Sequence, residues 1–177
     1  MWSNERGFTL VELMVTLALV VIILGLSLPN LGRIGNRFRL KGAANACSAA
    51  LHQARMEAMK SAGSVAIVFQ QPIDGISYDL VLFQDSNANS RLDGGERIID
   101  RIRLSDTGAA LQISNNTFEL NGDDPSVRAV RFNARGFPLT SSDGFASGSV
   151  TIRDGASGHT IAIKLSLLGE IHVDPVS

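Results

Sequence analysis

The chain has 177 residues, and its 16 Lys or Arg nearly balance its 17 Asp or Glu, giving a formal net charge of −1. This balance gives no global electrostatic reason to expect a polyanionic partner. The single cysteine, Cys47, excludes an internal disulfide, and we expect a small core residue rather than a redox or cross-linking group. The length allows one soluble domain beyond a single N-terminal apolar segment.

That apolar segment lies within the first thirty residues. Between Phe8 and Leu28 the only polar side chains are those of Thr9, Glu12, Thr16 and Ser27. A helix of roughly twenty residues, rising about 1.5 Å per residue, crosses a hydrocarbon layer of ~30 Å. The sequence therefore predicts a membrane span over residues 8–28. The charged region before it is very short and no small-x-small cleavage site follows, so we do not expect an ordinary secretory signal.

Glu12 is the exception within the predicted span. An unpaired ionised carboxylate in lipid costs several kcal/mol and marks a functional position by default. We therefore expect Glu12 to meet a cationic partner. The alternative is a carboxylate near the interface that reaches the lipid headgroups.

The residues around Glu12 resemble a known processing signal. The stretch in question is Gly7-Phe8-Thr9-Leu10-Val11-Glu12, preceded by a short polar leader that contains Arg6. It is similar to the prepilin motif of type IV pilins and of type II secretion pseudopilins. The resemblance implies that a prepilin peptidase removes residues 1–7 by cutting after Gly7 and that Phe8 becomes N-methylphenylalanine. It also implies that the chain joins other pilins or pseudopilins through its N-terminal helix. In that arrangement Glu12 meets the terminal amine of a neighbouring subunit.

The charges on either side of the predicted span disagree with this resemblance about orientation. Four cations follow the span, namely Arg33, Arg37, Arg39 and Lys41. The positive-inside rule would place them in the cytoplasm. We give precedence to the processing motif, which implies a single-pass protein of the bacterial inner membrane with a periplasmic C-terminal domain. The four cations then contact anionic headgroups or acidic neighbours, or form an ordinary solvated face.

The apolar helix is expected to continue beyond the span as an amphipathic half over residues 29–62. Pro29 removes a backbone donor and should kink or loosen the helix, as in pilins, where this segment takes part in assembly; the alternative is a simple helix end. The period then resumes with an apolar seam at Leu40, Ala44, Cys47, Leu51, Ala54, Ala58 and Ala62. We expect Gly63 to end the helix, and His52 to lie on its solvated side.

Residues 63–177 change character to short β-branched runs separated by Gly, Asn, Asp and Ser. We predict strands at residues 65–70, 77–84, 97–104, 127–133, 149–153, 160–165 and 170–173, with a further piece near 111–120. The fold class is α+β, one long N-terminal helix packed on a mostly antiparallel β domain. The run from Arg128 to Phe137 and the final strand pair near Gly169 resemble the β domain of H-type pseudopilins and of FimT/FimU minor pilins, so we expect a pilin-like fold.

The loop of residues 85–96 has the spacing of an EF-hand calcium loop. Its candidate oxygen ligands are Asp85, Asn87, Asn89, Asp93 and Glu96, at loop positions 1, 3, 5, 9 and 12. Two features oppose calcium: Ser90 replaces the usual glycine at position 6, and strands rather than helices flank the loop. An Asx-rich turn needs the same residue types, so a hairpin connection without metal is the alternative.

No catalytic motif is present, because the sequence lacks a G-x-S-x-G elbow, H-E-x-x-H, a P-loop and G-x-G-x-x-G. The resemblance to pilins implies a structural protein, a minor pilin that takes part in initiation or tip assembly of a type IV pilus. The alternative is the H-type minor pseudopilin of type II secretion. A second alternative is a minor pilin that captures DNA. The resembling DNA-capture proteins carry a C-terminal Gly-Arg-x-Arg, whereas Gly169-Glu170-Ile171-His172 places a carboxylate there, so we do not expect a nucleic-acid partner.

Overall fold

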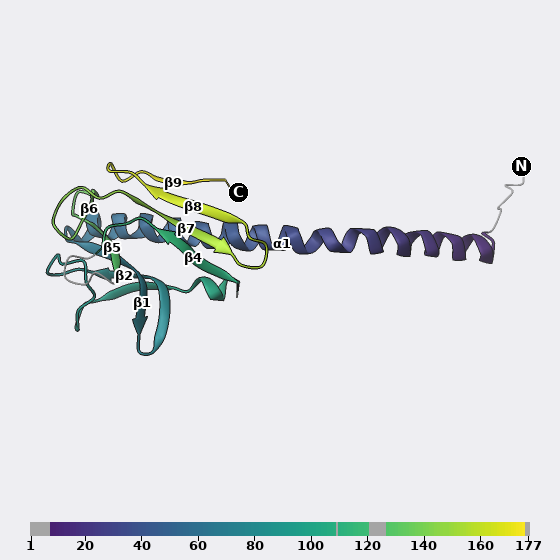
Figure 1. Cartoon of the computed structure of the whole chain (residues 1–177), viewed down its shortest axis with the longest axis horizontal. Coiled ribbons are helices and arrows are strands. Elements are labelled where there is room, and N and C mark those ends of the chain that lie inside the picture. Colours follow the sequence, from purple (N-terminus) through teal and green to yellow (C-terminus); the bar gives the residue numbers. More distant parts are fainter. Residues whose placement is uncertain (1–7, 109, 121–126, 176–177) are drawn as a thin grey trace, which may run out of the picture. The chain divides into compact units, whose positions relative to one another are not determined.

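A computed structural model describes residues 8–108, 110–120 and 127–175, and it leaves the side chains of 26–34 undescribed. The chain separates into two compact units, residues 1–35 and 36–177. One helix, α1 (Leu10–Ser61), contributes to both, and all strands belong to the second unit (Figure 1). The predicted α+β class is confirmed.

Helix α1 begins and ends close to the predicted limits of 8 and 62, and its helical assignment is unbroken through Gly25 and Pro29. In the first unit, the large apolar side chains from Phe8 to Leu24 are 49–82% exposed. Within the residues that the structure describes, no helix combines the length and the hydropathy needed to cross a membrane.

The C-terminal end of α1 is a Schellman motif. Gly63 N–H donates to Ala58 O at 3.2 Å, and Ala62 N–H donates to Met59 O at 3.4 Å. The left-handed position is Ala62, with φ of 50°, and Gly63 is the residue after it. The helix thus ends at Ser61, one residue before the predicted limit of 62, and Gly63 closes the cap.

The β domain contains two antiparallel sheets. The first has the order β3-β2-β1-β5-β6 and the second the order β4-β7-β8-β9. The strands are β1 (Val65–Ile73), β2 (Ile76–Gln84), β3 (Ile98–Ile102), β4 (Leu111–Asn116), β5 (Arg128–Phe132), β6 (Pro138–Leu139), β7 (Gly148–Asp154), β8 (Thr160–Leu165) and β9 (Ile171–Val173), with a 3₁₀ turn, η1 (Leu104–Asp106), after β3. Each predicted strand is present within a few residues. The two-residue β6 was not predicted, since it is too short to show an alternating pattern.

The main core joins both sheets to the second half of α1. The helix contributes two leucines, Leu40 and Leu51. Its other buried residues are small: Ala43, Ala44, Cys47, Ala50, Ala54 and Ala58. Their small side chains let the strands approach the helix closely, and larger residues such as Ile67 and Ile163 fill the space from the two sheets. The predicted seam is buried except for Ala62, which belongs to the helix cap.

A second, smaller core covers the opposite face of the first sheet. It consists of Ala66, Val68, Val81, Phe83 and Ala129, with Leu92 among the partly buried residues packed against it. Because strand side chains alternate between faces, β1 and β2 are buried on both sides, which explains their nearly continuous apolar sequence. Leu92 comes from the loop of residues 85–96, so that loop is part of the fold.

Candidate assembly site and the loop of residues 85–96

The N-terminal motif forms a capped helix start. Glu12 N–H donates to Thr9 Oγ1 at 3.2 Å, and Leu13 N–H donates to Thr9 O at 3.2 Å. Thr9 is therefore the N-cap and Glu12 the third helical residue, which is the spacing of a capping box. Gly7, the predicted cleavage position, lies outside the described residues, and Phe8 is 82% exposed.

This geometry gives Glu12 a local role that our sequence reasoning missed. A carboxylate in the first turn is stabilised by the positive end of the helix dipole and by the amide donors exposed there. The T-x-x-E spacing was visible in the sequence and could have revealed it. Capping explains why an acid is tolerated at the helix start, but it supplies no full positive charge to the carboxylate.

The helix beyond Glu12 has an exposed apolar surface. Thr16 is satisfied locally, because its hydroxyl donates to Leu13 O at 2.8 Å. The apolar side chains around it are about half exposed or more. A contiguous apolar surface of this size is typical of a segment that packs against other chains or lipid. Pro29, the other predicted assembly residue, lies within α1, and its side chain is outside the described part.

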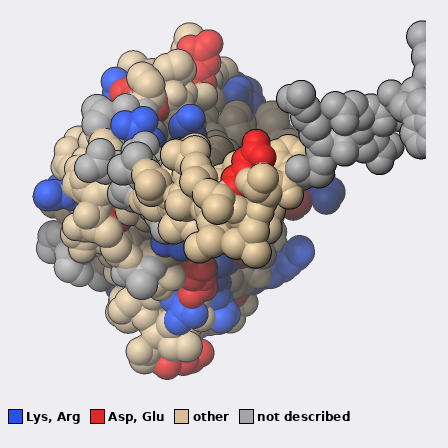
Figure 2. Space-filling view, turned by 90° about the vertical axis from the view of Figure 1, so that its right-hand side faces the viewer, with Lys and Arg blue, Asp and Glu red and all other residues tan. Residues whose placement is uncertain are grey.

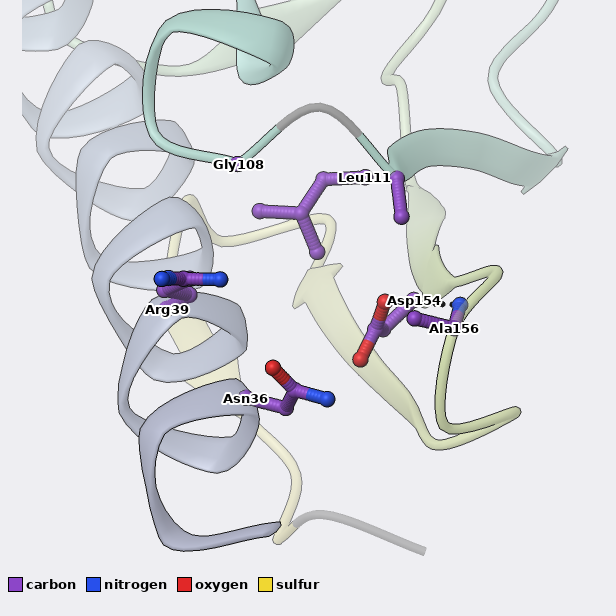
Figure 3. Close-up of a pocket in the computed structure, with 7 residues that line it drawn as sticks. Asn36, Arg39, Gly108, Leu111, Asp154 and Ala156 are labelled. Carbon is purple, nitrogen blue, oxygen red and sulfur yellow. Dashed lines mark hydrogen bonds between the residues drawn. The ribbon is translucent and has the colours of Figure 1, made fainter. Parts of the chain in front are cut away.

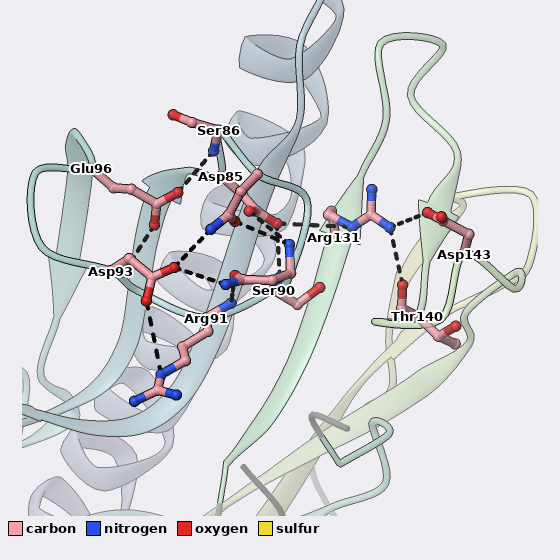
Figure 4. A network of polar contacts seen from close by, with 11 residues as sticks. Asp85, Ser86, Ser90, Arg91, Asp93, Glu96, Arg131, Thr140 and Asp143 are labelled. Carbon is pink, nitrogen blue, oxygen red and sulfur yellow. Dashed lines mark hydrogen bonds and ion pairs between the residues drawn. The ribbon is translucent and has the colours of Figure 1, made fainter. Parts of the chain in front are cut away.

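The loop of residues 85–96 connects β2 to β3 and is organised around Asp85 (Figure 4). The Asp85 carboxylate is buried and accepts the N–H groups of Asn89 at 3.1 Å and Ser90 at 2.9 Å. Arg131 of β5, 4% exposed, places Nε 3.8 Å from Asp85 Oδ2. Arg131 also contacts Asp143 and the carbonyl of Thr140, so a single buried cation links the loop to the β6–β7 connection.

The other two carboxylates of the loop also accept hydrogen bonds from the loop itself. Asp93 Oδ2 accepts the side-chain amides of Asn87 at 2.9 Å and Asn89 at 2.8 Å, and these bonds lower the pKa of the Asp93 carboxyl. Glu96 accepts Ser86 N–H at 2.8 Å and Asp93 N–H at 3.0 Å. All five predicted ligand residues therefore belong to one loop, in which side-chain oxygens hold backbone and amide donors.

The backbone of the loop differs from our expectation at position 6. Ser90 has φ of 59°, so it adopts the left-handed conformation that glycine provides in calcium loops. The missing glycine is thus a weaker argument against calcium than the sequence indicated. However, no group of three or more His, Cys, Asp or Glu able to hold a metal occurs in the part of the chain that the structure describes.

Sequence reasoning did not identify Arg131 as a residue of this site. Arg131 and Arg128 both lie on β5. Arg131 is buried, and Arg128 donates to Phe118 O, so these two cations serve the fold. Figure 2 shows positive and negative side chains interspersed on the face in view, without a continuous field of one sign.

A small cavity lies beside the start of the second unit (Figure 3). Its volume is about 40 Å³, and Asn36 and Arg39 face Leu111 and Asp154 across it. That volume holds a few water molecules, whereas pockets for small organic ligands start near ~300 Å³. The Asp154 carboxylate already accepts Ser157 Oγ–H at 2.5 Å and Ala156 N–H at 3.0 Å, and these bonds, the one from Ser157 first, lower the pKa of Asp154.

Two other predicted positions are as expected. Cys47 is a buried free cysteine, and burial raises the pKa of its thiol to about 12, with a smaller effect from nearby Asp79. His52 lies exposed on the helix surface. Cys47 is not placed to act as a nucleophile, since a reactive thiol needs a lowered pKa and access to solvent.

A capped N-terminal helix whose second half forms the core of a two-sheet antiparallel domain defines a pilin-like protein. The family model described as type II transport protein GspH matches residues 43–169, and that of the prokaryotic N-terminal methylation motif matches residues 2–28. The chain therefore belongs to the GspH family of pilin-like subunits.

A curated relative agrees with this assignment. The chain is 39% identical over 94 residues to the pilin-like protein PilA1 of Thermus thermophilus. The match covers 52% of this chain and 56% of that relative, so the chain spans little more than half of the relative's length. No solved structure matches the chain.

Proposed function

We propose that the chain is a minor pilin that takes part in initiation or tip assembly of a type IV pilus. The observation that carries this proposal is the presence of both a methylation motif at residues 2–28 and a GspH domain at residues 43–169 in one chain. The role is structural rather than enzymatic. The H-type minor pseudopilin of type II secretion is the second candidate, and membership of a family described as type II transport proteins favours it.

In this proposal, a prepilin peptidase removes residues 1–7, Phe8 becomes the methylated N-terminus, and residues 8–28 anchor the chain in the inner membrane with the β domain in the periplasm. The exposed apolar side chains of the first unit supply the surface that lipid covers before assembly and that neighbouring subunits cover afterwards.

Glu12 couples anchoring to assembly. Its backbone N–H is bonded to Thr9, but its carboxylate has no cationic partner among the described residues. Cleavage after Gly7 creates a positively charged terminal amine at Phe8 on every subunit. A neighbour's amine offers the full charge that the helix dipole does not, and pairing the two neutralises both in a layer of low dielectric constant.

The test is assembly of variants in the native host. We expect Gly7→Ala to leave the leader uncut, and Glu12→Gln to be cut and held in the membrane but to enter filaments at least about tenfold less, because a neutral amide cannot pair with the amine. The measurement is the ratio of subunit in sheared filaments to subunit in membranes. Thr9→Val is the matched control, since it removes the cap but keeps the carboxylate. Normal incorporation of Glu12→Gln would refute the pairing.

A further inference from the structure

We propose that Arg37, Phe38 and Lys41 form a basic and aromatic arc on α1 that binds the anionic headgroups of the membrane in which the chain is anchored. The inference rests on the proposed function, because it assumes the anchor at residues 8–28. We call these three residues the headgroup arc.

The three side chains share one side of the helix. At about 100° per residue they fall within an arc of roughly 100°. All three are exposed, and Phe38 is 69% exposed. Leu40, Ala43 and Ala44 lie on a different side of the helix and are buried against the sheets. The headgroup arc is therefore the side of the helix that the β domain leaves uncovered.

The arc has positive charge without compensation. No Asp or Glu occurs in the sequence between Glu12 and Glu57, whereas five Arg or Lys do. Neither Arg37 nor Lys41 forms an ion pair with another described residue. Arg39 is not included, since it lies at the edge of the small cavity facing Asp154 (Figure 3).

The aromatic ring distinguishes a lipid surface from a purely ionic partner. An exposed phenylalanine beside two cations gains little from duplex DNA, whose bases are already stacked on one another. It can enter the boundary between headgroups and acyl chains while the cations reach phosphate. The arc follows residue 28 by nine to thirteen residues and begins directly after the boundary between the compact units, at residues 35 and 36. A helix that left residue 28 along the membrane normal would carry Phe38 about 15 Å away from the hydrocarbon layer. The proposal therefore includes that this part of the helix lies against the membrane surface.

The test places a fluorescent reporter in the arc. The full chain with Trp2→Phe and Phe38→Trp has one tryptophan, since Trp2 is the only natural one. It is reconstituted into vesicles of phosphatidylcholine alone, or of phosphatidylcholine with phosphatidylglycerol, each with brominated acyl chains that quench nearby tryptophan. We expect markedly stronger quenching in the anionic vesicles than in the neutral ones. This difference should disappear at about 1 M salt, where the Debye length falls to about 3 Å.

Charge variants then test the arc itself. Adding Arg37→Gln and Lys41→Gln should lower the ratio of membrane-bound to unbound arc by about fivefold per cation, or roughly 25-fold together, in anionic vesicles. Adding Arg37→Lys and Lys41→Arg should retain the quenching. The matched control is Lys60→Gln with Arg135→Gln, which removes two exposed charges elsewhere on the same unit and should have no effect.

Three outcomes overturn the proposal: equal quenching in neutral and anionic vesicles, an equal loss in the control pair, or arc-dependent binding of duplex DNA without dependence on lipid charge. Flotation in high salt separates this inference from its premise. A chain that floats with vesicles but fails the quenching test keeps its anchor and loses the headgroup arc. A chain that does not float refutes the anchor, and with it the arc.

Discussion

At the residue scale, the acidic side chains of the loop of residues 85–96 have structural roles that their spacing in the sequence did not reveal. Asp85 accepts two backbone N–H groups and faces Arg131, and Glu96 accepts two more. A buried carboxylate with several donors is satisfied without a metal. These bonds also fix Leu92 over the smaller core, so the loop that resembles a calcium site stabilises a sheet.

We therefore expect added calcium to leave the melting temperature of the protein unchanged, because the loop's carboxylates already accept donors that a cation would have to displace. Calorimetric titration and thermal unfolding with calcium or with a chelator check this. Asp93→Asn is a useful comparison, since it weakens calcium ligation but keeps an acceptor for Asn87. Heat of binding together with a higher melting temperature, both lost in Asp93→Asn, would establish a calcium site.

Asp79 also connects residue chemistry to stability. Burial raises the pKa of its carboxyl although the bond from Leu104 N–H, 2.8 Å long, opposes this. A raised pKa in the folded state means that the ionised form costs stability at neutral pH. We expect Asp79→Asn to raise the free energy of unfolding at pH 7 by less than about 1 kcal/mol, because solvent screens a half-exposed group.

The sign of this effect can be checked by pH. The gain from Asp79→Asn should be present above the folded pKa of Asp79 and should vanish as the pH falls below 3.8, the ordinary value, where both side chains are neutral. Urea unfolding of both proteins across that range is the measurement. A gain that grows on acidification would contradict the assignment of burial as the dominant cause.

At the element scale, the turn between β1 and β2 shows how backbone conformation selects residues. Ile73 pairs with Ile76, leaving Asp74 and Gly75 as a two-residue turn with φ of 51° and 78°. Two positive φ values define a type I′ turn, whose twist matches the strands, and Asp-Gly is one of its preferred sequences. A side chain at Gly75 would meet no atom within 4 Å, so only its backbone constrains it.

We expect Gly75→Ala to lower the free energy of unfolding by about 1 kcal/mol, which is the cost of a left-handed conformation for a residue with a Cβ. Gly94→Ala is the matched control. Gly94 also has open space and is exposed, but it does not have a positive φ, so its substitution should change stability by less than about 0.5 kcal/mol. Equal effects at the two glycines in urea unfolding would show that φ is not the cause.

At the scale of the whole molecule, the chain combines an N-terminal methylation motif with a domain that is a compact unit. Both sheets of that domain depend on the same stretch of α1, from Leu40 to Ala58. The helix is therefore part of the domain's core as well as its connection to the proposed anchor.

The sequence by itself determined the parts of this protein that depend on local pattern. The motif at residues 7–12, the alanine seam and the alternating strands predicted a processed pilin-like helix and an antiparallel domain, because periodicity and short motifs act within a few residues. The same local information gave the correct spacing of the loop at residues 85–96, but not its role.

Only the tertiary structure decided which side chains meet across the chain. It placed Arg131 against Asp85, Leu92 on the second face of the first sheet, and β6 beside β5. It also left Phe38 uncovered while burying Leu40. These outcomes follow from contacts between residues far apart in sequence, whose partners depend on strand order and register rather than on any local pattern.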